Sequence, residues 1–99
     1  MRLARVVGTV TGTAKEGSLT GHRMLIVDLV DPEGNIQESG QVAADAVGAG
    51  VGDTVLVTTG SAARQARSTM GIPADMTVIM VVDEVVVGGR RTNPGEKGS

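Results

Sequence analysis

The sequence predicts a mostly β protein, a small five-stranded OB-like β-barrel with one short helix between the fourth and fifth strands. Short segments alternate aliphatic and polar residues with period two, as half-buried strands do. Turns rich in Gly, Pro and Asn separate these segments, and only one stretch begins with a residue that can cap the N-terminus of a helix. This combination is typical of a mostly antiparallel barrel, although an OB-fold usually carries its helix between the third and fourth strands.

The opening segment, Met1 to Thr13, is predicted to be a strand. One of its faces carries the small and aliphatic residues expected in the core, which are Ala4, Val6, Gly8 and Val10. The other face is mixed. Its aliphatic residues Leu3 and Val7 are either ordinary exposed side chains or part of a contact with another subunit, and the pattern leaves both interpretations open.

The second predicted strand covers residues 22–30, HRMLIVDLV, which is apolar on both faces apart from Asp28. Such a strand is expected to be covered on both sides. Residues 31–35, Asp-Pro-Glu-Gly-Asn, then predict a turn, because Pro presets φ and both Gly and Asn accept positive φ after it. The chain returns antiparallel over Ile36 to Glu38, and Gly40 is expected to break it before the next strand, Gln41 to Ala46.

A turn with glycine at every second position, GAGVGD over residues 48–53, joins that strand to the strand Thr54–Thr59, in which Val55 and Val57 alternate with Thr54, Leu56 and Thr58. A phosphate cradle is disfavoured, because Asp53 stands where a dinucleotide fingerprint needs a small residue and a strand follows instead of a helix. We interpret the turn as a tight connector that allows close approach of another backbone. Its residues are therefore candidates for a subunit contact: Gly48, Ala49, Gly50, Val51 and Gly52.

The one predicted helix begins at Ser61, a good N-cap after Gly60, and runs through Arg67 before Gly71 and Pro73 stop it. The longest aliphatic run follows. It is rich in β-branched residues and predicts a long central strand, Met76 to Val87. Residues 88–99 are polar and glycine-rich and have almost nothing to bury, so we expect a barrel domain over residues 1–87 and a flexible tail over 88–99.

The composition of the 99 residues limits both the core and the chemistry. The chain contains no Phe, Trp or Tyr, so its core is expected to be aliphatic and small, which favours burial of further surface by assembly. It contains no cysteine, which excludes disulfides and thiolate chemistry and fits a reducing cytosol. We expect neither a signal peptide nor a transmembrane span, because no apolar run approaches the ~20 residues that cross a bilayer.

The sequence offers few side chains that could act in catalysis. His22 is the only histidine and offers a metal no second imidazole or thiolate, so we interpret it as a surface residue and expect no metal or cofactor. The carboxylates lie at strand ends and in loops, where they suit either capping or acid–base chemistry: Asp28, Asp45, Asp53, Asp75 and Asp83. Ser61 follows a glycine at a strand-to-helix turn but lacks the second glycine of a nucleophile elbow. We therefore expect no enzyme activity.

Binding of single-stranded nucleic acid, or of another small ligand, is the alternative function for a barrel of this class. Nucleic-acid-binding barrels stack bases on aromatic side chains inside a basic groove, whereas this chain has no aromatic residue and a formal net charge of −2. Four arginines are available to contact phosphates: Arg64, Arg67, Arg90 and Arg91. On an acidic domain, such scattered arginines usually belong to a solvated surface.

Three motifs carry a resemblance to a known family: LARVVGTVTGTAK (residues 3–15) with the following LTGHRMLIVDLVD, VAADAVGAGVGDTVLVTTGSAAR (42–64), and IPADMTVIMVVDEV (72–85). On these motifs the chain resembles the EutN/CcmL family, the pentameric vertex proteins of bacterial microcompartments and carboxysomes. The resemblance covers residues 1 to about 87. The positions that match the family's motifs are Asp45, Asp53, Gly60, Ser61, Arg64, Asp75 and Asp83.

The resemblance implies a structural β-barrel subunit, without catalytic residues or cofactors, in a five-membered ring at the corners of an icosahedral shell. Its implied partners are further copies of itself and hexameric and pseudohexameric shell proteins. The tail, residues 88–99, is a candidate contact for enclosed enzymes, and neither nucleic acid nor membrane is an expected partner. The implied location is the microcompartment shell in the bacterial cytoplasm. Head-to-tail contact between unlike patches gives a closed cyclic ring.

Overall fold

The computed structural model describes residues 1–11, 23–60 and 75–92. Five strands in this part of the chain form the barrel: β1 (Arg2–Val10), β2 (Arg23–Val30), β3 (Ile36–Asp45), β4 (Thr54–Thr59) and β5 (Met76–Val81). The predicted helix from Ser61 to Arg67, and His22, lie outside the described residues.

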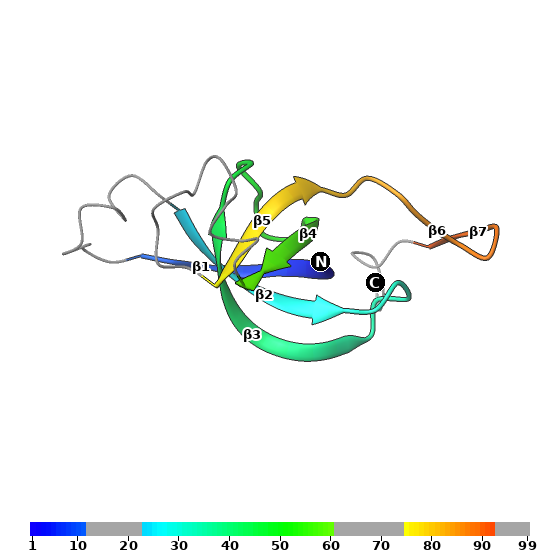
Figure 1. Cartoon of the computed structure of the whole chain (residues 1–99), viewed down its shortest axis with the longest axis horizontal. Helices are drawn as coiled ribbons and strands as arrows, with labels where there is room; N and C mark the ends of the chain where they lie inside the picture. The colour runs from blue at the N-terminus through cyan, green and yellow to red at the C-terminus, as the bar shows by residue number, and fades with distance from the viewer. Residues whose placement is uncertain (12–22, 61–74, 93–99) are drawn as a thin grey trace.

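The barrel closes in the order β1-β2-β3-β5-β4, as Figure 1 shows. The pair formed by β3 and β5 is parallel, and the other four pairs are antiparallel. The prediction of a small five-stranded, mostly antiparallel barrel is therefore confirmed. Closure pairs both edges of the sheet, which removes most of the free strand edge that an open sheet of this size exposes.

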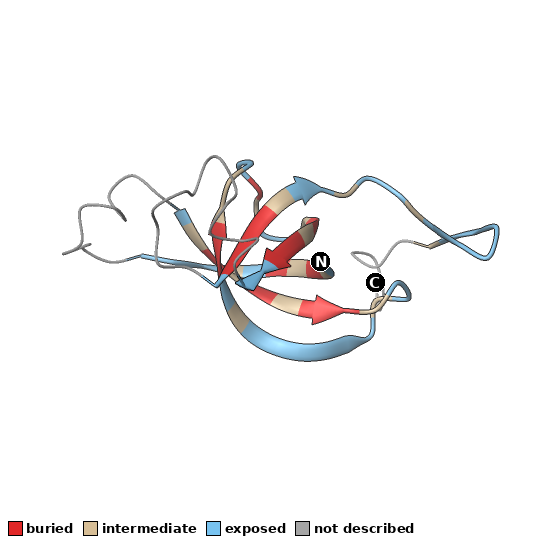
Figure 2. Cartoon of the chain, viewed as in Figure 1, coloured by how far each residue is buried: buried red, intermediate tan, exposed pale blue. Residues whose placement is uncertain are grey.

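The core is built from aliphatic side chains of all five strands and of the loop between β3 and β4. It comprises Ala4, Val6, Leu25, Val27, Leu29, Ala43, Ala49, Val55, Val57, Met76 and Val78. Figure 2 shows buried segments along the strands of the barrel, whereas the first half of β3 and the chain after β5 are mostly exposed. The inward positions predicted by period-two alternation in β4, Val55 and Val57, are both fully buried.

The face prediction for β1 holds only as far as Val6. Ala4 and Val6 are buried, but Val10, which was expected on the same core face, is exposed. The register between β1 and β2 shifts between Val6 and Gly8, so that Val7 forms a bulge. A bulge inserts one residue into the alternation, and residues beyond it turn to the other face of the strand. The prediction that Val10 is a core residue is therefore wrong.

Gly40 was expected to end one strand before another began, but β3 runs through it from Ile36 to Asp45. Gly40 has φ of +71° and its N–H donates to a side-chain oxygen of Asp28 at 3.0 Å. The register between β2 and β3 also shifts near Asp28. Glycine here permits an irregularity within one long strand, because it reaches positive φ without steric cost.

The long strand predicted from Met76 to Val87 is divided in the structure. The strand β5 ends at Val81, whose successor Val82 still donates its N–H to the carbonyl of Thr54 at 2.8 Å. After a break at residues 82–84, β6 (Val85–Val87) pairs with β7 (Arg90–Thr92) in a separate two-stranded antiparallel sheet. Residues 88–92, predicted as part of a flexible tail, therefore belong to this β6–β7 hairpin.

Candidate subunit-contact surfaces

The glycine loop, residues 46–53, is fastened to the barrel by backbone hydrogen bonds. The N–H of Gly52 donates to the carbonyl of Val6, and the N–H of Val6 donates to the carbonyl of Asp53, both at 2.9 Å. These reciprocal bonds extend the pairing between β1 and β4 into the loop. These bonds attach the loop to β1, although it contains three glycines.

Asp45 organises the start of this loop. Its Oδ1 accepts the N–H groups of Val47, Gly48 and Ala49 at 2.9–3.3 Å, and its side chain is only 1% exposed. Its Oδ2 accepts from a guanidinium nitrogen of Arg23 at 3.3 Å, and the same nitrogen donates to the carbonyl of Ala49 at 2.8 Å. A carboxylate buried in this way is stabilised because its charge is met by several donors.

Asp53 closes the other end of the loop, since its Oδ2 accepts the N–H of Gly50 at 2.8 Å. Both aspartates of the central motif thus have structural roles as acceptors of loop amides, in line with the capping interpretation of these residues. Gly60 has φ of +65° and donates its N–H to the carbonyl of Asp75. Asp83 is exposed between β5 and β6. Ser61 and Arg64 lie outside the described residues.

The predicted contact residues differ in how much they present to a neighbour. Val51 is 65% exposed and Val7 is 44% exposed, and each lies next to a residue that takes part in the hydrogen bonds between the loop and β1, Gly52 and Val6. Leu3 is half-buried. Ala49 is fully buried in the subunit's own core, so its side chain is not available for a contact between subunits. A further aliphatic residue of the loop, Val47, is exposed.

The three glycines of the loop have two different conformations. Gly48 and Gly52 have φ of +81° and +95°, which a residue with a side chain adopts only with strain. Gly50 does not have positive φ, and a Cβ added there would meet only Oδ2 of Asp53, at 3.9 Å. A side chain at Gly50 is therefore tolerated by the subunit itself and would extend from its surface.

The β6–β7 hairpin is a second exposed feature, and the sequence reasoning missed it. Its turn consists of Gly88 and Gly89, with φ of +60° and +80°. Two successive residues with positive φ between short extended segments are typical of the two-residue hairpin turn that matches strand twist. The Gly-Gly pair after a valine run was therefore the signal that could have predicted this hairpin.

The hairpin is attached to the turn between β2 and β3 by polar contacts. The hydroxyl of Thr92 donates to the carbonyl of Pro32 at 2.7 Å, and Arg90 forms an ion pair with Glu33 at 3.1 Å. A second ion pair, at 3.5 Å, joins Arg91 to Glu84 at the base of the hairpin. All four charged side chains are about half exposed or more, so each pair contributes little to stability.

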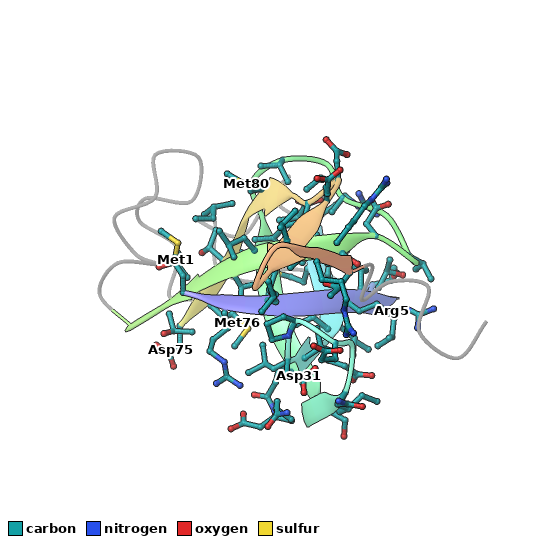
Figure 3. All side chains as sticks on the ribbon, turned by 90° about the vertical axis from the view of Figure 1, so that its right-hand side faces the viewer. Met1, Arg5, Asp31, Asp75, Met76 and Met80 are labelled. Atoms are coloured by element: carbon teal, nitrogen blue, oxygen red, sulfur yellow. The ribbon has the colours of Figure 1, made fainter. Side chains whose placement is uncertain are left out.

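A cavity of about 310 Å³ lies beside the turn between β2 and β3. Its lining comprises Arg5, Asp28, Val30, Gly34, Asn35 and Ile36. The Nε atom of Arg5 is buried and has no hydrogen-bond partner. Figure 3 shows Arg5 and Asp31 on the side of the barrel that carries the hairpin. A single unpartnered atom does not define a ligand.

Asp31 stabilises the turn below this cavity. Its Oδ1 accepts the N–H groups of Glu33 and Asn35, each at 2.9 Å, and its Oδ2 accepts from the side-chain amide of Asn35 at 3.0 Å. These bonds, the Asn35 side chain first, hold the pKa of the Asp31 carboxyl below its ordinary value. The turn predicted over residues 31–35 is present.

Within the described residues, no group of three or more His, Cys, Asp or Glu side chains could hold a metal ion. No helix in that part of the chain is long and apolar enough to cross a membrane.

Comparison with known proteins identifies the family. Residues 1–83 match the family model described as "Ethanolamine utilisation protein EutN/carboxysome". The bacterial microcompartment shell vertex protein EutN of Escherichia coli K12 is 43% identical over 90 residues, which cover 91% of this chain and 95% of that protein.

Two solved structures extend this similarity to the fold. The CcmL structure from Nostoc sp. PCC 7120 is 43% identical, covers 92% of this chain and 96% of its own, and has a TM-score of 0.83. GrpN, a pentameric microcompartment shell protein from Rhodospirillum rubrum, is 40% identical over 88% of this chain and 99% of its own, with a TM-score of 0.77. The chain therefore belongs to the EutN/CcmL family of microcompartment shell vertex proteins, which are structural proteins and not enzymes.

Proposed function

We propose that this chain forms a homopentameric ring that closes the vertices of a microcompartment shell. One observation carries the proposal, namely similarity over nearly the whole chain to a shell vertex protein and to a pentameric shell protein. Flat sheets of hexamers cannot close by themselves, and a five-fold unit at each corner supplies the required curvature. The described part of the chain fits a unit whose role is assembly, because it leaves many aliphatic side chains exposed.

The surface of the subunit supports assembly on physical grounds. The core lacks aromatic side chains, and a domain of this length buries only a modest share of its surface on folding. Aliphatic residues on several sides of the described barrel remain 39–78% exposed: Met1, Val7, Val10, Ile36, Val42, Val47, Val51, Met80, Val81, Val86 and Val87. Exposed apolar surface on this scale is expected to be covered by other subunits.

The glycine loop and the adjoining surface of β1 form the proposed contact between neighbouring subunits. This surface comprises Leu3, Val7, Gly48, Gly50, Val51 and Gly52. The loop suits this role because its backbone is fixed to β1 and because Gly50 leaves room for a neighbour. In a cyclic ring each subunit uses two unlike patches, so this surface meets a different surface on the next copy.

Native mass spectrometry of the purified full-length chain at micromolar concentration tests the proposal. We expect a homopentamer as the main species. A monomer, or a closed hexamer, would contradict the vertex function. Sedimentation velocity should use interference optics, because a chain without aromatic residues gives neither absorbance near 280 nm nor intrinsic fluorescence.

The proposed partners are hexameric and pseudohexameric shell proteins, which surround each pentamer, and enclosed enzymes that contact the C-terminal tail, predicted over residues 88–99. Co-expression of the chain with hexameric shell proteins is expected to give closed polyhedral shells. Co-expression without it is expected to give elongated or leaky ones. If shells of both preparations were equally closed when imaged by electron microscopy, the chain would not act at vertices.

A further inference from the structure

We infer that the β6–β7 hairpin is an arm between subunits, whose outer face packs on the glycine loop of the next copy in the ring. We define the outer face as Val86 with the Glu84–Arg91 ion pair. The inference rests on the proposed function, because it requires a ring. It goes beyond that function by naming the second of the two unlike patches.

The two faces of the hairpin differ in what they contact. Val87 pairs with Arg90, and Val85 pairs with Thr92, whereas Val86 pairs with Arg91. Since side chains alternate along a strand, Arg90 and Thr92 share one face, and these are the residues that bind the turn between β2 and β3. Val86 and Arg91 share the opposite face, which points away from that turn.

The outer face has the composition of a contact surface. Val86 is 57% exposed and is the most exposed of the three β6 valines that the sequence places in a row. The Arg91 side chain is 68% exposed and its Nε lies 3.5 Å from a carboxylate oxygen of Glu84, a contact that uses one of the five N–H donors of a guanidinium. An apolar side chain beside an exposed arginine is a combination that protein interfaces favour.

The hairpin has little stability of its own. Its strands are three residues long, none of their residues is buried, and among the described residues they pair only with each other. A two-stranded sheet without a hydrophobic face packed on other structure is at best marginally stable in water. The contacts that attach it to the described part of the barrel involve exposed groups that contribute little stability, and packing against another copy would supply the burial that the hairpin lacks there.

A second copy of this chain is the partner that the observations favour. A relative of the same fold, GrpN from Rhodospirillum rubrum, is a pentameric shell protein, so copies of this fold associate with one another. The acceptor surface is the glycine loop, because it combines exposed aliphatic side chains, Val47 and Val51, with a backbone held rigidly to β1. Peptide groups of the loop supply acceptors for Arg91. Because the loop is already held in place, only the marginally stable hairpin loses conformational entropy when the two surfaces bind.

The first half of β3 also exposes aliphatic side chains, but it is a poorer acceptor. Ile36 and Val42 are separated by polar residues that include Glu38, and the strand is irregular at Gly40. Charged residues and irregularities of this kind protect a strand from pairing with other chains. Val42, which is 53% exposed, is therefore a matched control for Val86.

A charge exchange between the two surfaces tests the contact in the full-length chain. The single variants Val86→Lys and Val51→Asp are each expected to raise the concentration for half-assembly by roughly tenfold or more, as loss of a buried hydrophobic contact does. The double variant Val86→Lys with Val51→Asp is expected to recover assembly to within roughly threefold of wild type, because opposite charges then meet across the contact. Analytical ultracentrifugation with interference optics measures each concentration.

The control pair uses the same charges at a site outside the contact. Val42→Lys is expected to assemble as the wild type does, and Val42→Lys with Val51→Asp is expected to assemble no better than Val51→Asp alone. Far-UV circular dichroism of each variant verifies that the barrel is folded. Rescue by Val86→Lys and not by Val42→Lys would support the arm.

Two results would overturn the inference while leaving the proposed function intact. In the first, the wild type is a pentamer and Val86→Lys assembles as well as Val42→Lys. In the second, both single variants weaken the ring but the double variant is no better than either of them. A wild type that is not a ring would overturn the proposed function and the inference together, so the two failures are distinguishable.

Discussion

The glycine loop and the β6–β7 hairpin are both exposed and rich in glycine and valine, but the barrel holds them very differently. The loop exchanges backbone hydrogen bonds with Val6, buries Ala49, and has two aspartates that accept its amides. The hairpin buries no residue and is attached through exposed polar groups. The difference therefore lies in attachment and not in glycine content: N–H groups of the loop find acceptors on β1 and on two aspartates, whereas the two strands of the hairpin pair with each other.

The largest effect on subunit stability is expected from removal of the Asp45 carboxylate, which accepts hydrogen bonds from the start of the glycine loop. Asp45→Ala leaves three amide N–H groups and Arg23 without their shared acceptor, and we expect it to destabilise the subunit by about 3 kcal/mol. Urea denaturation followed by far-UV circular dichroism, at matched protein concentration, measures the loss. Asp83→Ala, which removes an exposed carboxylate between β5 and β6, should cost little. Equal effects of the two variants would show that the loop does not depend on Asp45.

The next test separates strain within the subunit from crowding between subunits. Gly50→Val is expected to leave the subunit folded and to weaken the ring by ~1–3 kcal/mol per contact, since overpacking costs this much at a close interface. Gly48→Val is expected to lower subunit stability as well, because Gly48 has φ of +81°. Sedimentation and thermal unfolding of both variants give the two readouts. Normal assembly of Gly50→Val would place the loop in solvent.

A smaller effect is expected from shortening the hairpin. A chain that ends after Val87 lacks β7, so β6 has no strand to pair with, and we expect the ring to weaken by roughly tenfold in concentration while the barrel remains folded. A chain that ends after Thr92 retains the hairpin and is expected to assemble as the full-length chain does. If both truncated chains assembled equally well, the hairpin would not contribute to the ring.

The smallest effect concerns the turn at Asp31, where the hairpin is attached. Since the pKa of Asp31 is lowered on folding, its carboxylate stabilises the folded state above the ordinary pKa of about 3.9, and this stabilisation is lost as the pH falls through the lower folded value. The difference in unfolding free energy between wild type and Asp31→Asn is therefore expected to be full at pH 6 and to shrink below pH 4. A difference independent of pH would exclude a role for the charge.

Much of the barrel could be predicted because its strands and turns are determined by residues close together in the sequence. The alternation around Val55 and Val57 identified their inward face, and the Asp-Pro-Glu-Gly-Asn turn was recognisable from its own residues. The site was less predictable. The sequence indicated that the glycine loop matters but could not show that Ala49 is buried, because burial depends on what packs over a residue.

The sequence by itself determined the class of fold, the aliphatic character of the core and the membership of the family, since these follow from composition, periodicity and motifs that every stretch of the chain carries locally. Only the tertiary structure decided where those patterns are interrupted. The bulge at Val7 exposes Val10, Gly40 lies within one strand instead of between two, and the valine run divides at residues 82–84. Each interruption depends on register with a neighbouring strand, a relation between distant segments that no local pattern records.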